Sequence, residues 1–344
     1  MISTRSFGVV QLLAAFLVLS LFIGCNKGKD SSSSAAGPDS ESSAASQRNT
    51  SENEGEESWF KLSLAQWSLH KMIQSGELDP VDFAQKANEL GFSGIEYVSA
   101  LYTEYLKKGD DAEKAMQELL LILKDRSAHY QVDNVLIMVD GEGHLAELDD
   151  AERNQSVENH KKWVDAAAFL GCHSIRVNAH GEGTEEEVAA AAVKGLSALA
   201  GYAADKGINV IVENHGGYTS SGKWLSNVMK QVNLPNCGTL PDFGNFCINV
   251  SYGSINAEEC EDIYDIYQGV AELLPYAKGV SAKTYDFDDE GNQPLIDYYK
   301  MMKVVKDNGY TGYIGVEFEG DSMTEIEGIE ATRRLIMKAA GELK

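Results

Sequence analysis

The segment NGYTGYIGVE at residues 308–317 repeats a pattern that also occurs as LGFSGIE at 90–96, LGCHSIR at 170–176 and KGINVIVE at 206–213. In each copy a Gly follows a helical pattern, an apolar stretch comes next, and a charged residue closes that stretch. A Gly directly after a helix is typical of a helix end in the left-handed conformation. The pattern therefore predicts repeated units in which a helix turns into a strand that carries a charged residue at its carboxyl end.

Around these copies, short apolar stretches alternate with helical patterns from Phe60 onward. We expect eight strands, near residues 61–66, 94–98, 134–139, 173–178, 208–213, 237–242, 278–284 and 313–318. Helices are expected between and after them, near residues 79–90, 111–129, 148–170, 184–206, 222–232, 257–274, 294–307 and 323–340. This alternation predicts an α/β protein with a single-domain (β/α)8 TIM barrel, because parallel strands need crossover helices. An open doubly wound sheet is the alternative, although no G-x-G-x-x-G motif opens the first unit.

Capping signals support several helix starts. Asp79 precedes Pro80, which is the expected order of a cap and a first helical residue. The spacing of a capping box also occurs three times, in Thr184…Glu187, Asn256…Glu259 and Ser322…Glu325. We therefore expect helices to begin close to these positions.

The amino terminus carries an export signal. Residues 1–24 are a predicted signal peptide, because Arg5 precedes an almost wholly apolar stretch from Gly8 to Gly24. The sequence LFIGC at 21–25 resembles a bacterial lipoprotein signal, which implies cleavage before Cys25 and lipidation of that residue. Residues 25–58 are rich in Ser, Glu, Gly and Ala, which predicts a lipid-anchored, disordered and flexible linker before a barrel at 59–344. We expect an exported protein that its lipid alone holds to a membrane, on the periplasmic or cell-surface side. An ordinary signal peptide or a short membrane anchor is the alternative.

The formal net charge is −24, so we expect no nucleic-acid partner, because phosphate backbones would be repelled. Four cysteines follow Cys25, and no two of them form a C-x-x-C pair. Zinc-ribbon and thioredoxin-like sites are therefore not indicated. An exported compartment permits disulfides, but the sequence leaves the pairing of Cys172, Cys237, Cys247 and Cys260 open.

Charged residues close most of the expected strands, at the end where (β/α)8 barrels carry their active sites. They include Glu96, Arg176, Glu213, Asp242, Lys283 and Glu317. Side chains alternate along a strand, and this alternation turns Glu213, Lys283 and Glu317 inward, away from the helices. Acidic groups that converge in a low-dielectric mouth need either protons or a cation. The cation is either a divalent metal ion or an ion-pair network in which Lys283 and Arg176 neutralise the carboxylates.

The chain resembles the xylose isomerase-like barrel superfamily of sugar isomerases and epimerases. The resemblance rests on AQWSL at 65–69, GFSGIE at 91–96, VENHGG at 212–217, PDFGN at 241–245 and GVEFEG at 315–320. In that family a Glu, an Asp, a His or Gln, and a second Glu from strands 5 to 8 hold a metal ion. The resemblance implies Glu213, Asp242 and Glu317 as ligands of Mn2+, Mg2+, Co2+ or Zn2+. Ser281 stands where the family has His or Gln.

The resemblance also implies that Glu213 and Glu317 are a catalytic acid–base pair, which moves a proton beside a sugar carbonyl. Substrate contacts are expected from His180, His215, Asn245, Lys283, Glu96 and Trp67. Histidines outside the expected mouth are interpreted as structural, namely His129, His144, His160 and His173.

The predicted function is therefore a metal-dependent isomerase or epimerase of a free sugar, keto sugar or polyol derivative. The same site would support β-elimination from a keto-glycoside, in which the enolate expels the aglycone. A third alternative, motivated by Ser281, is a catalytically inactive barrel that binds carbohydrate at the cell surface. The expected partner is a small carbohydrate, and a homo-oligomer is compatible with the sequence.

The tether can be tested by two changes. Cys25→Ser should give a protein that membranes no longer retain, because the lipid-bearing thiol is lost. Deletion of residues 1–58 should leave a folded, soluble barrel, because the linker has no apolar face to bury. Membrane fractionation checks the first result and circular dichroism the second. A truncated chain that is insoluble or unfolded would show that this segment belongs to the core.

Overall fold

The computed structural model describes residues 58–343. The expected signal peptide, Cys25 and the expected linker lie outside the described residues, apart from Ser58. None of the helices in the described part of the chain is long and apolar enough to cross a membrane.

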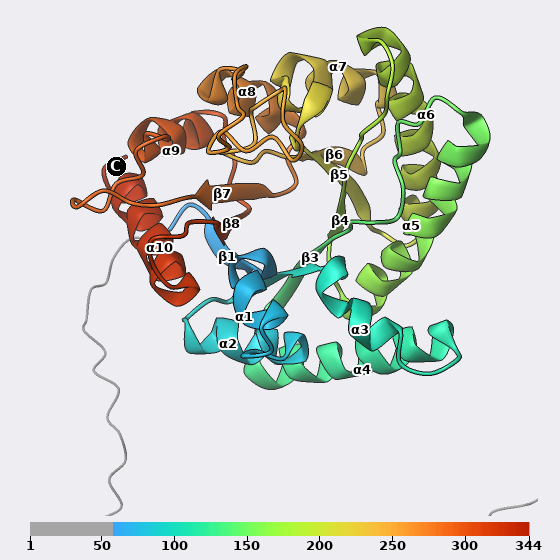
Figure 1. Ribbon diagram of the computed structural model, residues 1–344, viewed down its shortest axis with the longest axis horizontal. Coiled ribbons are helices and arrows are strands. Elements are labelled where there is room, and N and C mark those ends of the chain that lie inside the picture. The colour runs from blue at the N-terminus through green and yellow to red at the C-terminus, as the bar shows by residue number, and fades with distance from the viewer. Residues whose placement is uncertain (1–57, 344) are drawn as a thin grey trace, which may run out of the picture. The chain divides into compact units, whose positions relative to one another are not determined.

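Eight parallel strands form the centre of the molecule and confirm the predicted barrel (Figure 1). They are β1 (Lys61–Ala65), β2 (Gly94–Val98), β3 (Asp133–Met138), β4 (Ser174–Val177), β5 (Asn209–Glu213), β6 (Cys237–Leu240), β7 (Val280–Thr284) and β8 (Tyr313–Phe318). Strands β1 to β6 pair in chain order, β7 pairs with β8, and β1 also pairs with β8, which the open doubly wound alternative does not allow. Strands β6 and β7 close the ring through isolated parallel bridges, Thr239 to Ala277 and Asp242 to Ser281.

Helices surround the ring of strands (Figure 1). They are α1 (His70–Gln74), α2 (Phe83–Glu89), α3 (Thr103–Leu106), α4 (Ala112–Tyr130), α5 (Asp150–Leu170), α6 (Glu185–Ala204), α7 (Gly222–Val232), α8 (Ile266–Leu273), α9 (Tyr298–Asp307) and α10 (Glu325–Gly341). Short 3-10 turns lie at Gln66–Leu69, Pro80–Asp82, Ser99–Tyr102, Gly217–Ser220 and Leu274–Tyr276. The large apolar core lies between helices and strands, and a smaller cluster that includes Ala65, Val135, Ile211 and Leu240 fills the ring itself.

The helix-to-strand glycines are in the predicted conformation. Gly91, Gly171, Gly207 and Gly309 all have φ between 70° and 84°. This left-handed backbone ends the preceding helix and lets the chain reverse into the next strand within a few residues.

Two of the expected helix starts are confirmed and two are wrong. The Asp79 side chain caps the turn at Pro80, and Thr184 forms a complete capping box with Glu187. By contrast, α10 begins after Thr324, whose box partner is Glu327. The Ser322 hydroxyl instead donates to Asp286 at 2.8 Å, so Thr324, two residues later, caps the helix.

The box expected at Asn256 does not form, because that part of the chain belongs to a loop that a disulfide closes. Cys247 pairs with Cys260, and α8 begins only at Ile266, after its cap Asp265. The predicted helix at 294–307 likewise begins later, at Tyr298. Cys172 and Cys237 are buried free thiols.

Gly315 on β8 offers a test of the packing inside the ring. A Cβ atom there would lie 2.6 Å from Oε1 of Glu96 and 2.9 Å from its Cδ, so a Gly315→Ala variant must displace the buried Glu96 side chain. We expect this overpacking to lower the free energy of unfolding by about 1–3 kcal/mol. Thermal or urea denaturation measures the change.

Gly201→Ala is the matched control. Gly201 lies in α6, and no described atom comes within 4 Å of a Cβ added there. Alanine should stabilise the helix at this position by about 0.5–1 kcal/mol. Equal stability changes in the two variants would show that Gly315 does not face the carboxyl group of Glu96.

Candidate active site

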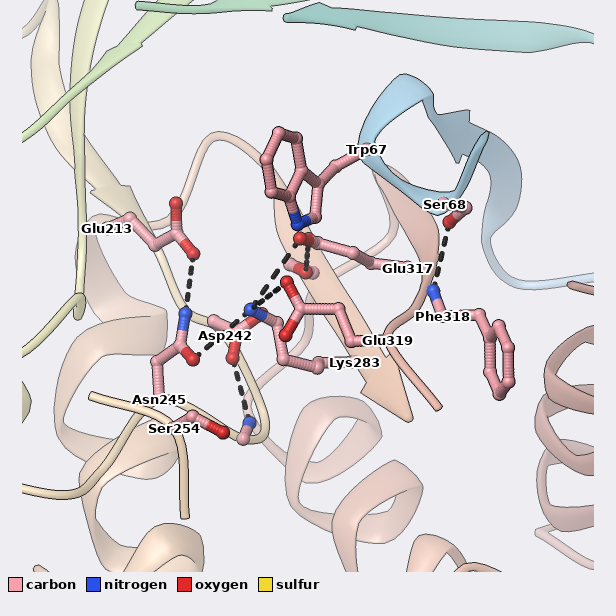
Figure 2. Close-up of polar contacts among 12 residues, drawn as sticks. Trp67, Ser68, Glu213, Asp242, Asn245, Ser254, Lys283, Glu317, Phe318 and Glu319 are labelled. Carbon is pink, nitrogen blue, oxygen red and sulfur yellow. Dashed lines mark hydrogen bonds and ion pairs between the residues drawn. The ribbon is translucent and has the colours of Figure 1, made fainter. Parts of the chain in front are cut away.

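Three carboxylates from three strands meet at the carboxyl end of the barrel. Glu213 is the last residue of β5, Asp242 follows β6, and Glu317 lies near the end of β8. One oxygen of each lies within 4.8 Å of the other two, and all three side chains are buried (Figure 2). The fold thus brings together the three residues that the sequence singled out as metal ligands.

The backbone around Asp242 is held firmly. Asn214, which follows Glu213, accepts a hydrogen bond from the Asp242 amide at 2.8 Å and donates to the Asp242 carbonyl at 3.0 Å. The amide of Gly244 donates to Oδ1 of Asp242 at 2.8 Å. Oδ2 of Asp242 is buried and has no hydrogen-bond partner among residues 58–343. This oxygen is therefore available to a cation in the mouth.

Lys283 of β7 lies among these carboxylates (Figure 2). Its Nζ is 3.9 Å from Oδ2 of Asp242, 3.6 Å from Oε1 of Glu317 and 3.3 Å from Oε1 of Glu319. Burial by itself would lower the pKa of the ammonium group, but the carboxylates outweigh burial and raise the pKa well above its ordinary value. Lys283 is therefore a permanent cation, as the ion-pair alternative requires.

Arg176 of β4 is the second buried cation. Its Nε lies 2.8 Å from Oε2 of Glu213, an ion pair without the angle of a hydrogen bond, and its Nη1 donates to Oδ1 of Asp140 at 2.8 Å. Burial tends to raise the pKa of Asp140, but Arg176 outweighs it and lowers that pKa. Asp140 was not among the site residues predicted from the sequence, although it follows β3 and is a charged residue close to a strand end, like those that were predicted.

The mouth of the barrel, where the carboxyl ends of the strands meet, holds more negative than positive charge. The ion pairs of Lys283 and Arg176 involve five carboxylates: Asp140, Glu213, Asp242, Glu317 and Glu319. Burial is the main cause that raises the pKa of Glu213 and, more strongly, of Asp242, despite the attraction of Arg176 and Lys283. The two cations therefore do not neutralise the cluster when all five groups are ionised.

The donor set fits a divalent metal ion. Three buried carboxylates with oxygens close together, one of them without a partner in the described chain, are ligands suited to such an ion. Ser281, which replaces the family's His or Gln, donates a hydrogen bond to Oε2 of Glu317 at 2.8 Å. It thus orients one of the three carboxylates.

Asn245 and Glu96 adjoin the cluster from two directions. Asn245 links Glu213 to Lys283, because its Nδ2 donates to Glu213 at 3.0 Å and its Oδ1 accepts from Lys283 at 3.1 Å. Glu96 lies deeper in the ring, against Gly315, and accepts a hydrogen bond from Ser63. Burial raises the pKa of Glu96 to about 8, so it is mainly protonated at neutral pH.

Aromatic side chains and imidazoles line the rim. Trp67 is half-buried and stacks on His70, with ring centroids 4.5 Å apart. His180 and His215 lie with their centroids 6.2 Å apart. His144, interpreted from sequence as structural, lies 5.9 Å from His180 and so joins the same group of rings.

The chain belongs to the xylose isomerase-like TIM barrel family, whose model matches residues 84–339. Among curated proteins, it is similar to the C-glycoside deglycosidase alpha subunit of Arthrobacter globiformis, at 33% identity over 55 residues. It is also similar to the 3'-dehydrocarminate deglycosidase alpha subunit of a Microbacterium species, at 29% identity over 76 residues. These matches cover 16% and 21% of this chain and span only 16% and 22% of the relatives' length.

Solved structures share the fold at low sequence identity. The 3-keto-D-glucoside 4-epimerase of E. coli matches with a TM-score of 0.57 and 13% identity, covering 75% of this chain and 94% of the epimerase. The IOLI protein, crystallised with a bound zinc atom, matches with a TM-score of 0.61 and 14% identity, covering 82% of this chain and 99% of that protein. Sugar epimerases are thus among the structural neighbours of this barrel.

The raised pKa of Glu96 predicts a pH-dependent stability. The carboxyl ionises near pH 4.5 in the unfolded chain and near pH 8 in the folded protein, so stability should fall as pH rises from about 4.5 to 8. Glu96→Gln removes this loss, which amounts to about 1.4 kcal/mol per unit of pKa difference. Thermal melts at pH 5 and pH 9, with chelator present, measure it.

The variant should gain stability relative to wild type at pH 9 but not at pH 5. Glu330→Gln, on the exposed side of α10, is the control and should leave the pH profile unchanged. Parallel pH profiles for Glu96→Gln and wild type would mean that Glu96 is already ionised in the folded protein.

Proposed function

We propose that this protein is a metal-dependent enzyme that moves a proton on the carbon beside the carbonyl group of a keto sugar. The observation that carries this proposal is the buried cluster of Glu213, Asp242 and Glu317, whose negative charge Arg176 and Lys283 leave uncompensated. The family and the fold of its sugar-epimerase neighbours support the same chemistry.

In this proposal Glu213, Asp242 and Glu317 hold a divalent ion, of which Mn2+, Mg2+, Co2+ and Zn2+ are the candidates. When bound, such an ion polarises a carbonyl and acidifies the neighbouring C–H bond. The zinc in the IOLI structure and the magnesium in a xylose isomerase-like barrel from Mycobacterium smegmatis support the assignment.

The acid–base roles fall to Glu213 and Glu317, which approach the mouth from β5 and β8. Burial raises the pKa of Glu213 in the metal-free site, whereas a bound divalent ion would lower it and keep the carboxylate ionised, as a general base requires. Lys283 is a fixed positive charge that can stabilise the oxyanion formed when the proton leaves. Asn245 and Trp67 are proposed to bind sugar hydroxyls or a sugar ring face, and His180 and His215 are proposed to contact the substrate beside them. Glu96 lies deeper in the ring, so it is proposed to influence the substrate only indirectly, through its electrostatic interaction with Glu213 and Glu317.

Isomerisation or epimerisation is the proposed outcome when the proton returns to the sugar. β-Elimination is the second candidate, favoured by the similarity to deglycosidase alpha subunits. Both begin with the same proton abstraction, and a leaving group beside the enolate decides between them. A catalytically inactive carbohydrate-binding barrel is the remaining alternative, and it predicts no exchange of carbon-bound protons.

We also propose that the protein is exported and anchored by a lipid on Cys25. The disulfide between Cys247 and Cys260 supports export, because disulfides persist mainly in oxidising compartments.

The metal assignment predicts one bound divalent ion per chain. Asp242→Ala should lose the ion and the activity while the barrel stays folded, because it removes the carboxylate whose Oδ2 accepts no hydrogen bond within residues 58–343. Metal analysis after purification without chelator, and after addition of each of the four ions, measures this. Asp321→Ala, at an exposed loop position, is the control. Wild-type protein that binds none of the four ions would leave Lys283 as the cation of the site.

The acid–base assignment predicts distinct defects. Glu213→Gln and Glu317→Gln should each lower turnover on a keto sugar by on the order of 10²–10⁴-fold, because each removes a base but keeps the side-chain size. One of the two variants should still exchange the carbon-bound proton of the substrate with solvent deuterium, since the other Glu can begin the transfer. Proton NMR in deuterium oxide follows this exchange. Near-native turnover in both variants would refute the mechanism.

A further inference from the structure

The loop between β6 and α8 is cross-linked by a disulfide, a backbone bridge and side-chain hydrogen bonds. The disulfide Cys247–Cys260 closes it, and a bridge from Ser251 to Gly216 joins it to the segment after β5. Asn249 ties it internally, since its Oδ1 accepts from the amides of Glu261 and Asp262, both at 3.0 Å. Long connections held this firmly usually carry function.

Tyr252 lies in this loop in an unfavourable setting. Its φ is +64°, a left-handed value that bulky side chains rarely adopt, and its side chain is 66% exposed. Such strain is typical of ligand-binding positions.

Tyr252, His215 and His180 form a row of neighbouring rings. Its ring centroid lies 5.1 Å from that of His215, and His215 lies 6.2 Å from His180. Nδ1 of His215 is shielded from solvent and has no hydrogen-bond partner in the described part of the chain. The row therefore offers ring faces together with an unused polar atom.

The row adjoins both the carboxylate cluster and a cavity. His215 follows Glu213 by two residues, which places the row directly beside the acid–base site. His180, at one end of the row, also lines a cavity of about 290 Å³ together with Tyr218 and, from the disulfide-closed loop, Ile248, whereas His215 and Tyr252 lie outside its lining. This volume is close to the lower limit of small-molecule sites, roughly 300 Å³.

We propose that His180, His215 and Tyr252 form a second subsite that holds the ring of an aglycone. The substrate is then a keto-glycoside with a second ring, rather than a free keto monosaccharide. This inference rests on the proposed keto-sugar chemistry and names its substrate class. Aromatic and imidazole rings contact either an aryl ring or the apolar face of a second sugar, and aryl rings stack on them best.

The test compares two substrates with the same keto sugar, a methyl and a 4-nitrophenyl 3-keto-β-D-glucoside. Wild type should have the higher kcat/KM on the nitrophenyl compound. Tyr252→Ala should lower the ratio of the two kcat/KM values by about three- to tenfold, the size of one ring contact. Tyr252→Phe keeps the ring and should keep the ratio. An unchanged ratio in Tyr252→Ala would overturn the subsite.

A binding measurement separates this inference from the proposed function. 4-Nitrophenyl β-D-glucoside carries the aglycone ring but no keto group, so its binding does not require turnover. If neither keto-glucoside reacts, the proposed function fails. Weaker binding of this probe to Tyr252→Ala than to wild type and Tyr252→Phe would still support the subsite. Equal binding of the probe to all three proteins would contradict the proposed subsite.

Discussion

Compensation of buried charge governs the carboxyl face of this barrel. Carboxylates from β3, β5, β6 and β8 gather around Arg176 and Lys283, and the two cations leave negative charge unbalanced. Because carboxylates in a dry site are costly without a counter-charge, the mouth must bind either protons or a further cation. Burial is the main cause that raises the pKa values of Glu213 and Asp242, and the neighbouring carboxylates raise them further. This imbalance suits the divalent ion and the proton transfer that we propose for the site.

The closure of the barrel and the geometry of the site depend on the same contacts. Strands β6 and β7 meet only at isolated bridges in the described chain, and one of these joins Asp242 to Ser281. The amide of Ser281 donates to the Pro241 carbonyl at 2.9 Å, while its hydroxyl orients Glu317. Ser281 therefore links the closure of the ring to the carboxylate cluster.

In the proposed chemistry, the strands and the loops supply different groups. Carboxylates and cations stand on strand ends, whose positions the ring of backbone hydrogen bonds holds closely, as proton transfer requires. His180, His215 and Tyr252 stand on the segments that follow the strands, where sequences can vary without disturbing the core. Epimerisation and elimination share the first set of groups, so the loops and the substrate's own leaving group determine which reaction follows.

The sequence by itself was sufficient to predict the eight strands, the barrel and the meeting of Glu213, Asp242 and Glu317. These follow from local signals: a Gly after each of several helices, alternation along strands, and a charge at the end of most strands. The sequence raised the pairing of Lys283 with the carboxylates only as one alternative, and the tertiary structure was needed to show it, together with the bond from Arg176 to Asp140 and the pairing of Cys247 with Cys260. The tertiary structure also decided that Thr324 rather than Ser322 caps α10, because Ser322 donates a hydrogen bond to Asp286. Each of these depends on the distance between residues far apart in the chain, and no local pattern records that distance.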